Sequence, residues 1–592
     1  MIAEQSDTKG KECLPEETAA RFQKILREVG VTFSETPRHF VEGACSLQLT
    51  DEYHGWQVNG KGTDKAYCRA SAYGEAMERL QNRFIFSRGD LSSGALSCLG
   101  FTCWPDEELR PVGAIREIPE LWADFRSLRG TAPESEDEDF LRKILGEDET
   151  AFVPYYSVRK GQTVMLPDRV ITLMAGSNGL SAGNTCPEAL CQALCEIAER
   201  AAKFKAFQEG KTPPEIPAAL IPGQTESLKA RVEARSGCRI TFLDLSMGLG
   251  FPVAGLLMTD QRRQRYRIKL GAHPRMDLAL ERCLTELLQG FDSAKWAEDD
   301  CVMIPWTGRE EAWNTAGNLT SAFRTDLSFV PDSFLAGQAS WHFSPWEEAK
   351  NLSNTEACRH LIGRLMLLAP DVWIRNTGFL GVPAFRVYVP GVSLIPQSFS
   401  AKLTALPRYR TWMASPEELS LEQAGELLSA LEDPELPLGT RTDQMELPYS
   451  LEGLRGVLHY ILGGDTEAER LLEAAGSPVE ICMARALRLR HRGIPPEQAE
   501  ALLCRFFGGR TSQAALAVLE APEEALRRWR DPFCFLSVRQ REEKLRREDM
   551  LRTRRERLST LYRKLKEKMK DGMPVQDAAL WMEPESARIT ST

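Results

Sequence analysis

The pattern of apolar residues changes near Ser415, and this change limits most strongly what the chain can fold into. Before it, short runs rich in β-branched or aromatic residues, such as 239–245 and 385–389, alternate with longer helical patterns. Beyond Ser415-Pro416-Glu417-Glu418, which reads as a helix start, Ala/Leu/Glu-rich segments separated by Gly or Pro follow at 419–431, 451–462, 467–475 and 496–506. The sequence predicts an α+β domain of mixed sheets and helices over residues 1–414, then an all-α, tetratricopeptide-like domain over 415–592.

Length and composition are those of a soluble protein with more than one domain. A chain of 592 residues exceeds what one hydrophobic core covers, and 43% hydrophobic with 27% charged residues is close to the globular average. The chain starts without a basic segment followed by an apolar one, and no apolar run is long enough to span a bilayer. The net charge of −10 gives no overall attraction to nucleic acid or to an anionic membrane. We expect a cytoplasmic protein that binds no membrane.

The cysteines and histidines do not indicate a metal site. Fifteen cysteines are scattered without a paired CxxC framework, so reduced and mostly buried thiols are expected. Cys191 and Cys195 lie one helical turn apart, but no second Cys or His pair accompanies them, and core packing is favoured. The seven histidines are equally dispersed. Neither a zinc site nor a Cys/His nucleophilic pair is predicted.

Two segments with the pattern Glu-x-x-Glu-Arg carry the strongest chemical signal. The first predicts a helix that projects Glu75 and Glu78 from one face. The second predicts a helix on which Glu188, Glu196 and Glu199 fall within an arc of about 80°. Clustered carboxylates repel one another unless cations lie between them, and Mg²⁺ takes one or two carboxylates plus substrate phosphates. One copy alone would be read as an ordinary helix with ion pairs.

Three further features are weaker. The Ser/Asn/Gly-rich turn 177–185 precedes the second helix and offers hydroxyl, amide and backbone N–H donors where anions are favoured. In the helix pattern at 278–289, Arg282 could neutralise phosphate, although its spacing to Glu286 favours a simple salt bridge. The run 55–62 resembles a P-loop, but Gly62 stands where Ser or Thr should follow Lys61, so a Walker-type NTPase is rejected.

Taken in order, these segments resemble the signature of the YcaO family over residues 55–395. The pieces that carry the resemblance are Gly60-Lys61-Gly62, the Ala-Ser-Ala-x-Gly-Glu-x-x-Glu-Arg helix from Ala70, Ser177-Asn178-Gly179-Leu180-Ser181-Ala182-Gly183-Asn184, Ala272-His273-Pro274 with Glu281-Arg282-x-x-Thr285-Glu286-x-x-Gln289-Gly290, and Val389-Pro390-Gly391.

The resemblance implies an ATP-binding fold without a P-loop and with magnesium held by glutamates, so the implied cofactors are ATP and Mg²⁺. The implied metal ligands are Glu75, Glu78, Glu188, Glu196 and Glu199. The implied nucleotide contacts are Lys61, Ser181, Asn184, Arg200, Arg282 and Glu286. The implied catalytic residues are Glu75, Glu78, Glu199 and Arg282.

The family's chemistry implies phosphorylation of a peptide-backbone amide oxygen, which turns a poor leaving group into a good one. Thioamidation or a related peptide modification is the favoured outcome. Azoline formation is less favoured, because the chain ends in 585–592 without a Pro-x-Pro-x-Pro tail. The helical extension resembles the namesake subgroup, which is linked to β-methylthiolation of a small-subunit ribosomal protein. An accessory role in that modification, with a regulatory ATP site, is the alternative.

The implied partners are a peptide or protein substrate, a sulfur donor or partner enzyme, and a second copy of the chain as a homodimer. The pattern at 541–570 predicts a basic helix with thirteen Lys or Arg, six Asp or Glu, and Leu551, Leu558 and Leu565 at heptad spacing. It could contact RNA or an acidic partner. Packing of its apolar seam on its own domain is favoured, so nucleic-acid binding is expected through this helix or not at all.

Overall fold

The chain forms two compact units. The first comprises Met1–Ser87, Ser97–Ser398 and Arg557–Thr592, and the second Arg88–Leu96 and Phe399–Glu556. The computed structural model describes residues 9–86, 104–130, 132–145, 148–287, 289, 303–306, 318, 328–346, 351–395, 408–409, 412–413, 415–433, 438, 449–530 and 538–576. The predicted boundary after residue 414 stays a prediction.

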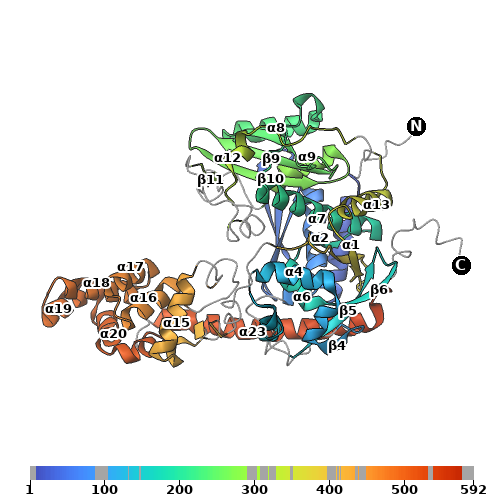
Figure 1. Ribbon diagram of the computed structural model, residues 1–592. Coiled ribbons are helices and arrows are strands. Elements are labelled where there is room, and N and C mark those ends of the chain that lie inside the picture. The colour runs from blue at the N-terminus through green and yellow to red at the C-terminus, as the bar shows by residue number, and fades with distance from the viewer. Residues whose placement is uncertain are drawn as a thin grey trace. The chain divides into compact units, whose positions relative to one another are not determined.

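Three antiparallel sheets form the framework of the first unit (Figure 1). The first has the order β1 (Ser34–Val41), β2 (Ala44–Asp51), β3 (Trp56–Gly62). The second has the order β11 (Ile304–Pro305), β10 (Arg265–Ala272), β9 (Val253–Asp260), β8 (Arg239–Asp244). The third has the order β4 (Glu108–Pro111), β5 (Glu149–Ser157), β12 (Trp373–Asn376), β13 (Ala384–Tyr388), β7 (Leu180–Ala182), with β6 (Gln162–Pro167) paired to β5.

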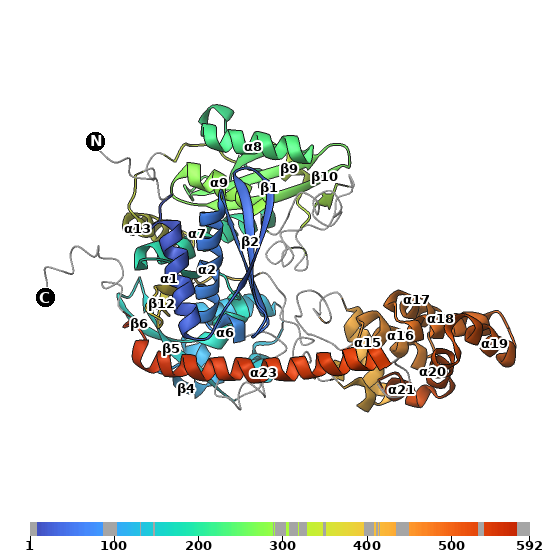
Figure 2. The ribbon, with the colours of Figure 1, turned by 180° about the vertical axis from the view of Figure 1, so that it is seen from behind.

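Three helices connect these sheets. Helix α2 (Lys65–Gln81) lies against β2, β3 and α1 (Pro15–Glu28), as Figure 2 shows. Helix α7 (Cys186–Gln208) contacts β7 and β13 of the third sheet and β9 and β10 of the second, and α9 (Met276–Leu287) packs on β9 and β10. The Ala, Leu and Ile side chains of α7 are buried in one apolar core with residues of both sheets. Helices α2, α7 and α9 are the three predicted from the glutamate and arginine motifs.

Local sequence determines where these helices start and how closely they pack. Asp64 caps α2 by accepting a hydrogen bond from the N–H of Tyr67, and Thr185 caps α7 by accepting from Glu188. A Cβ atom at Gly60 on β3 would lie 2.2 Å from the carbonyl oxygen of Cys68 on α2. Glycine is therefore required there so that the helix can approach the strand.

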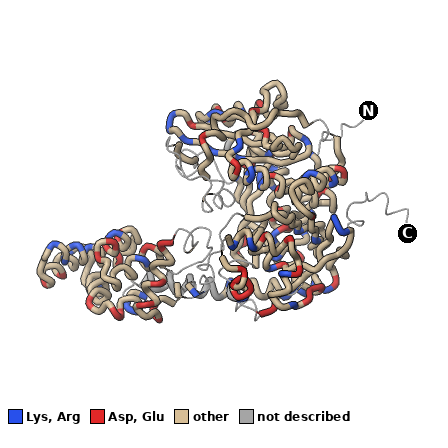
Figure 3. The backbone as a smooth tube through the Cα atoms, viewed as in Figure 1, with Lys and Arg blue, Asp and Glu red and all other residues tan. Residues whose placement is uncertain are grey.

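Additional helices and short 3-10 turns surround the three sheets. The described part of the first unit also contains α4 (Pro119–Arg129), α5 (Asp137–Leu145), α6 (Asp168–Ala175), α8 (Gly223–Ser236), α12 (Asp332–Ala336) and α13 (Asn354–Leu365). Figure 3 shows Lys and Arg interspersed with Asp and Glu along the chain, so neither sign of charge is confined to one segment.

The second unit is helical throughout its described part. Its helices are α15 (Leu421–Glu432), α16 (Leu451–Ile461), α17 (Asp465–Ala475), α18 (Pro478–His491), α19 (Pro496–Phe507), α20 (Gly509–Glu520) and α21 (Ala525–Arg530). Successive helices from α15 to α21 pack on one another around an apolar core. The predicted order of a mixed α/β domain followed by a helical region is confirmed, and the likeness to tetratricopeptide repeats stays a prediction.

One predicted helix start is wrong. Ser415 makes no side-chain cap, and Pro416–Glu418 form only a 3-10 turn. The helix begins at Leu421, where the hydroxyl of Ser420 accepts from the N–H of Gln423 and the Gln423 side chain accepts from the N–H of Ser420. This reciprocal capping satisfies two backbone donors and stabilises the later start.

The last helix, α23 (Val538–Gly572), returns to the first unit from Arg557 onward. Its residues Leu558, Leu561, Tyr562, Leu565 and Met569 are buried. The prediction of a buried apolar seam is confirmed for Leu558 and Leu565. The seam belongs to the first unit, however, and not to the predicted helical domain 415–592. The side chain of Leu551 lies outside the described residues. No helix in the described part of the chain is both long and apolar enough to cross a membrane.

Candidate active site

A cavity of about 450 Å³ lies in the first unit, between helices α2, α7 and α9. Residues of β3 and β10, and of the segment that leads into α1, complete its wall. Ten of the eleven predicted site residues line it: Lys61, Glu75, Glu78, Asn184, Glu188, Glu196, Glu199, Arg200, Arg282 and Glu286. The structure therefore brings together side chains from four separate stretches of sequence. Their individual roles stay predictions.

The acidic side chains of α2 and α7 are held by arginines of their own helices. Arg79 forms ion pairs with Glu75 at 3.5 Å and with Glu78 at 3.4 Å, and Arg200 forms one with Glu196 at 2.9 Å. Burial raises the pKa of Glu78 to about 8; Arg79 opposes this increase, while Glu196 and Glu75 add to it. A buried carboxyl among other carboxylates favours the approach of a cation.

At the start of α7, Glu188 is held by hydrogen bonds from two directions. The amide of Asn184 donates to both Glu188 oxygens at 3.2 Å, and the backbone N–H of Glu12 donates to Oε2 at 2.8 Å. Lys11 lies 3.5 Å from the same carboxylate. Asn184 also accepts a hydrogen bond from the hydroxyl of Thr18 at 3.0 Å, so α1 and α7 meet at this point.

Two basic side chains, Lys61 and Arg282, also line the cavity. Lys61 on β3 forms an ion pair with Glu286 on α9. Burial lowers the pKa of Lys61 to about 8, against the opposing effects of Glu199 and Glu75. The guanidinium of Arg282 donates to the carbonyl oxygen of Ala272 at 2.6 Å and to the side chain of Gln192 at 3.0 Å, which fixes the orientation of its planar fork.

Ser181 is the exception among the predicted residues. It lies on β7, paired with Phe385, and is fully buried, whereas its neighbour Ala182 lines the cavity. Its hydroxyl has no hydrogen-bond partner among the described residues. The alternation of side chains along a strand explains why this residue faces away from its neighbour. Its predicted nucleotide contact stays a prediction.

Several residues of the wall were not predicted. Arg79, Lys203 and Lys269 line the cavity, as do Lys9 and Glu281. The ammonium of Lys9 donates to both Glu281 oxygens at 2.7 and 2.8 Å. Arg79 had a signal in the sequence, because it ends the first Glu-x-x-Glu-Arg segment. Lys9 had none, because it lies outside every motif.

The glutamates of the cavity suit a metal ion that is also bound by phosphate oxygens of a nucleotide. Within the described ranges, no group of three or more His, Cys, Asp or Glu side chains is close enough to hold a metal by itself. Mg²⁺ usually keeps only one or two protein carboxylates and fills its other positions with water and phosphate oxygens. Carboxylates together with Lys61 and Arg282 in the wall of one cavity therefore fit a metal–nucleotide complex better than a metal alone.

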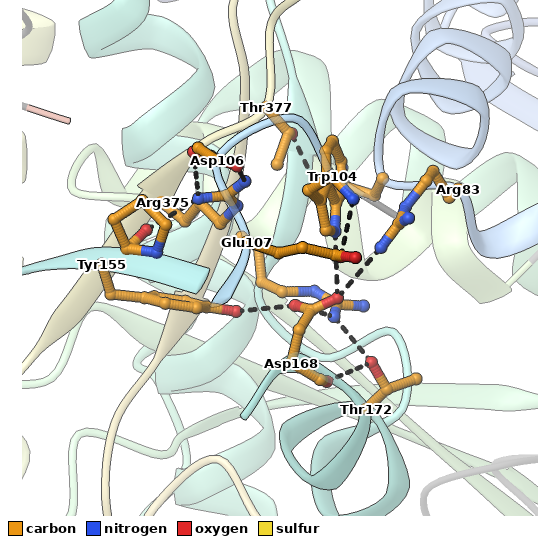
Figure 4. Close-up of polar contacts among 12 residues, drawn as sticks. Arg83, Trp104, Asp106, Glu107, Tyr155, Asp168, Thr172, Arg375 and Thr377 are labelled. Atoms are coloured by element: carbon orange, nitrogen blue, oxygen red, sulfur yellow. Dashed lines mark hydrogen bonds and ion pairs between the residues drawn. The ribbon is translucent and has the colours of Figure 1, made fainter. Parts of the chain in front are cut away.

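A second polar cluster lies outside the cavity and anchors the end of α2 (Figure 4). Asp168 accepts from Arg386 at 2.8 Å and from the hydroxyl of Tyr155 at 3.1 Å, and Arg83 approaches it at 3.5 Å. Burial tends to raise the pKa of Asp168, but Arg386, Arg83 and Arg375 together lower it well below its usual value. Arg83 follows α2 directly, so this cluster helps to position the helix that carries Glu75 and Glu78.

Comparisons with known proteins agree with the motifs. A family model described as YcaO cyclodehydratase, ATP- and Mg²⁺-binding, matches residues 59–393, which is more than half of the chain. The chain is 31% identical over 404 residues to the ribosomal protein S12 methylthiotransferase accessory factor YcaO of Escherichia coli, covering 65% of this chain and 66% of that protein. It is 28% identical over 400 residues to an uncharacterized protein of Haemophilus influenzae, covering 66% and 67%.

The match thus spans just under two thirds of the E. coli relative's length. Among solved structures, YcaO from Methanopyrus kandleri bound with AMPPCP and Mg²⁺ is similar with 20% identity and a TM-score of 0.41, covering 64% of this chain and 92% of that one.

Proposed function

Because the chain belongs to the YcaO family of ATP- and Mg²⁺-binding proteins, we propose that it is an ATP- and Mg²⁺-dependent accessory factor in the methylthiolation of a small-subunit ribosomal protein. The observation that carries this proposal is the 31% identity over 404 residues to the E. coli accessory factor. The helical second unit supports it, since stacked helices offer extended surfaces for a partner protein. The proposed partners are the methylthiotransferase and its ribosomal substrate; a homodimer stays a prediction.

In this proposal, the cavity binds the nucleotide. Glu75, Glu78, Glu188, Glu196 and Glu199 would hold the metal, and Lys61, Asn184, Arg200, Arg282 and Glu286 would contact ATP. A bound Mg²⁺ would offset the charge of the phosphate oxygens. The fork of Arg282, already oriented by Ala272 and Gln192, suits two phosphate oxygens at once. The hydrogen bonds around Glu188 keep that carboxylate directed at the cavity.

Complementation tests the accessory role. The chain is expressed in an E. coli strain that lacks its YcaO relative, and the fraction of protein S12 that carries a methylthio group is measured by mass spectrometry. We expect the wild-type chain to raise this fraction. The variant Glu199→Gln should fail to do so, because it removes a carboxylate from the cavity. Glu226→Gln on α8, a half-exposed glutamate that is paired with Lys229 at 3.1 Å and lies outside the cavity, is the matched control.

Two outcomes test separate parts of this proposal, namely the accessory role itself and its dependence on the cavity. Soluble wild-type chain that leaves S12 unchanged would contradict the accessory role. Full complementation by Glu199→Gln would show that the Glu199 carboxylate is dispensable for the accessory role.

A second candidate function is activation of a peptide-backbone amide by phosphorylation of its oxygen, leading to a thioamide or a related group. The description of the family as cyclodehydratases favours this candidate, because cyclodehydration requires an amide oxygen to leave. Phosphorylation makes that oxygen a good leaving group, and Lys61 and Arg282 would stabilise the charge that develops on the phosphoryl oxygens.

Phosphate release tests the second candidate. The protein is incubated with ATP, Mg²⁺, sulfide and a candidate peptide, and both phosphate and peptide mass are followed. Release that requires the peptide, together with a mass change of oxygen replaced by sulfur, would support amide activation. Phosphate release that is identical without peptide would count against it.

A further inference from the structure

Four strand ends of the second sheet meet at one edge, and two of them carry an arginine. Arg239 begins β8 and Arg265 begins β10, both beside the end of β9. The short strand β11 pairs with Arg265 through Pro305 (Figure 1). Because neighbouring strands lie about 4.8 Å apart, the four ends span about 14 Å. The residues of β10 that line the nucleotide cavity, Lys269 and Leu270, lie further along the strand.

The turn between β9 and β10 adds two more arginines to this edge. Asp260 accepts hydrogen bonds from the backbone N–H groups of Arg262 and Arg263, both at 3.1 Å. Asp260 also forms an ion pair with Arg265 at 3.5 Å, and Gln264 closes the turn in the left-handed region with a φ of 52°. Arg262 and Arg263 are exposed, and neither is paired with a carboxylate of the described residues. The turn is therefore fixed, while two guanidinium groups can bind an anion.

A half-exposed tryptophan lies beside this turn. The backbone N–H of Trp306 donates to the carbonyl oxygen of Gln264 at 2.8 Å, and its indole N–H donates to Asp332 at 3.0 Å. The residue nevertheless remains 47% exposed. An aromatic ring of this size usually gains stability from burial, so a ring that is held at the surface in a fixed orientation offers a stacking surface. Exposed aromatic rings next to basic side chains are typical of proteins that bind single-stranded nucleic acid.

The types of side chain at this edge indicate which anion it binds. A guanidinium binds phosphate through two parallel hydrogen bonds, and the exposed basic residues here, Arg239, Arg262 and Arg263, are all arginines. The chain has a net charge of −10, so an anion is attracted by this local charge only. An acidic peptide would pair with the arginines but would make no use of the ring of Trp306. A nucleic-acid duplex keeps its bases stacked on one another, whereas a single strand can place a base on the ring.

We propose that this edge, which we call the arginine edge and which comprises Arg239, Arg262, Arg263, Arg265 and Trp306, binds single-stranded nucleic acid. Arg239, Arg262 and Arg263 contact phosphates, Arg265 supports the turn through Asp260, and one base stacks on Trp306. The arginine edge differs from the sequence prediction, which placed any nucleic-acid contact in the basic pattern at 541–570. It depends neither on ATP binding in the cavity nor on the accessory role.

The test uses the full chain and fluorescence anisotropy. The probes are a labelled oligouridine RNA, the corresponding oligothymidine DNA, an RNA duplex, and a DNA strand of the same length in which every base is missing. The variants are the double change Arg262→Gln with Arg263→Gln, and the single changes Trp306→Ala and Trp306→Phe. Lys24→Gln with Arg27→Gln is the matched control, because both residues are exposed on α1 and their loss removes the same charge elsewhere.

The two kinds of contact should respond differently. Loss of Arg262 and Arg263 should weaken single-strand binding by about tenfold and reduce the slope of log affinity against log salt by about 1.4, since each phosphate contact contributes about 0.7. Trp306→Ala should weaken it by at least about fivefold with the salt slope unchanged, and should leave binding of the strand without bases unchanged. Trp306→Phe keeps a ring and should retain most of the affinity. The tighter of the RNA and DNA strands identifies the source of the natural ligand.

Four results would overturn the proposal. The wild type could bind neither single strand, or the control variant on α1 could lose as much affinity as the double arginine variant. The duplex could bind as tightly as the single strands, with no effect of Trp306→Ala on any probe. Finally, a polyglutamate peptide could displace the bound strand at the same concentration as unlabelled oligonucleotide, which would assign the arginine edge to an acidic protein partner.

Discussion

Lys61 at the end of β3 and Glu286 on α9 form an ion pair that joins the first and the last of the motifs around the cavity. Both side chains are about a quarter exposed, so the pair is partly shielded from water. Within the cavity it is a direct contact between a strand of the first sheet and a helix that packs on the second.

This ion pair predicts a measurable coupling between two positions. Lys61→Met and Glu286→Gln should each lower the free energy of unfolding. The double variant should lose less than the sum of the two losses by about 1 kcal/mol, because either change alone leaves a charge that is about three-quarters buried without its partner. Urea unfolding of the four proteins measures this. The pair Lys570–Glu567, with side chains 55% and 72% exposed, is the control and should show weaker coupling. Additive effects at Lys61 and Glu286 would contradict the prediction.

Asn184 should be among the most sensitive polar residues of the cavity. It accepts from Thr18 and donates to Glu188, and it is 7% exposed. Asn184→Ala should lower the free energy of unfolding by about 1–3 kcal/mol, because Thr18 and Glu188 lose a partner in a buried place.

Asn184→Asp should cost more than Asn184→Ala, since it puts a second carboxylate beside Glu188. Chemical unfolding at neutral pH measures both variants. The control is Gln57→Ala, which removes an exposed side-chain hydrogen bond donated by Gln48 and should change stability by less than about 0.5 kcal/mol. If the aspartate variant were as stable as the wild type, Asn184 would not be holding a charged Glu188.

Asp124 should make stability depend on pH. Burial raises its pKa to about 6, although the hydroxyl of Tyr388 and the N–H of Gly391 donate to it and act in the opposite direction. An unfolded aspartate titrates near pH 4, so between about pH 4 and 6 the folded state binds more protons than the unfolded state. This contribution is fully present below about pH 4 and is lost as the pH rises through 6.

The variant Asp124→Asn cannot titrate at this position and serves as the reference. From pH 4.5 to 7.5, the wild type should lose on the order of 2 kcal/mol of unfolding free energy relative to Asp124→Asn. Parallel urea titrations at the two pH values provide the measurement. A difference between the two proteins that stays constant with pH, or that changes in the opposite direction, would contradict the raised pKa.

The motifs predicted the cavity well because helix periodicity is a local property. Glu188, Glu196 and Glu199 fall on one side of any helix with this spacing, and all three line the cavity. The rejection of a P-loop at Lys61 agrees with the structure, in which Gly60 and Lys61 are strand residues of β3. Only glycine fits at position 60, because α2 passes too close to the strand to leave room for a Cβ atom.

What the motifs could not predict depends on contacts between segments that are distant in sequence. Lys9 and Lys11 meet Glu281 and Glu188 only after the chain has folded, and no periodicity marks them. Ser181 belongs to a matched motif, but the pairing of β7 with β13 determines which way it faces. The helix start at Leu421 depended on the choice between two serines, Ser415 and Ser420, and reciprocal capping with Gln423 decided it.

The packing of α23 makes a prediction about where the chain can be cut. Tyr562 is fully buried, with its ring edge-on to Phe86 at 5.4 Å between centroids, and the side chain of Gln576 exchanges two hydrogen bonds with the backbone of Asn376. These residues belong to the first unit although they follow the helical segment. A chain ending at residue 414 lacks them and leaves an apolar surface on the first unit uncovered.

We therefore expect the fragment 1–414 to be aggregation-prone and much less stable than the full chain. Loss of the Tyr562 side chain alone should lower the free energy of unfolding by about 3–5 kcal/mol, which is measured with the full-length variant Tyr562→Ala. This loss is large, because the free energy of unfolding of a domain is only about 5–15 kcal/mol in total. Replacing residues 415–556 by a flexible linker keeps 557–592 and should restore solubility and the unfolding temperature of the first unit. If the fragment 1–414 is as stable as this linked form, the last helix is dispensable for the first unit. The linked form is also the appropriate protein for testing whether the helical unit recruits the methylthiotransferase, because it removes that unit without removing part of the first unit's core.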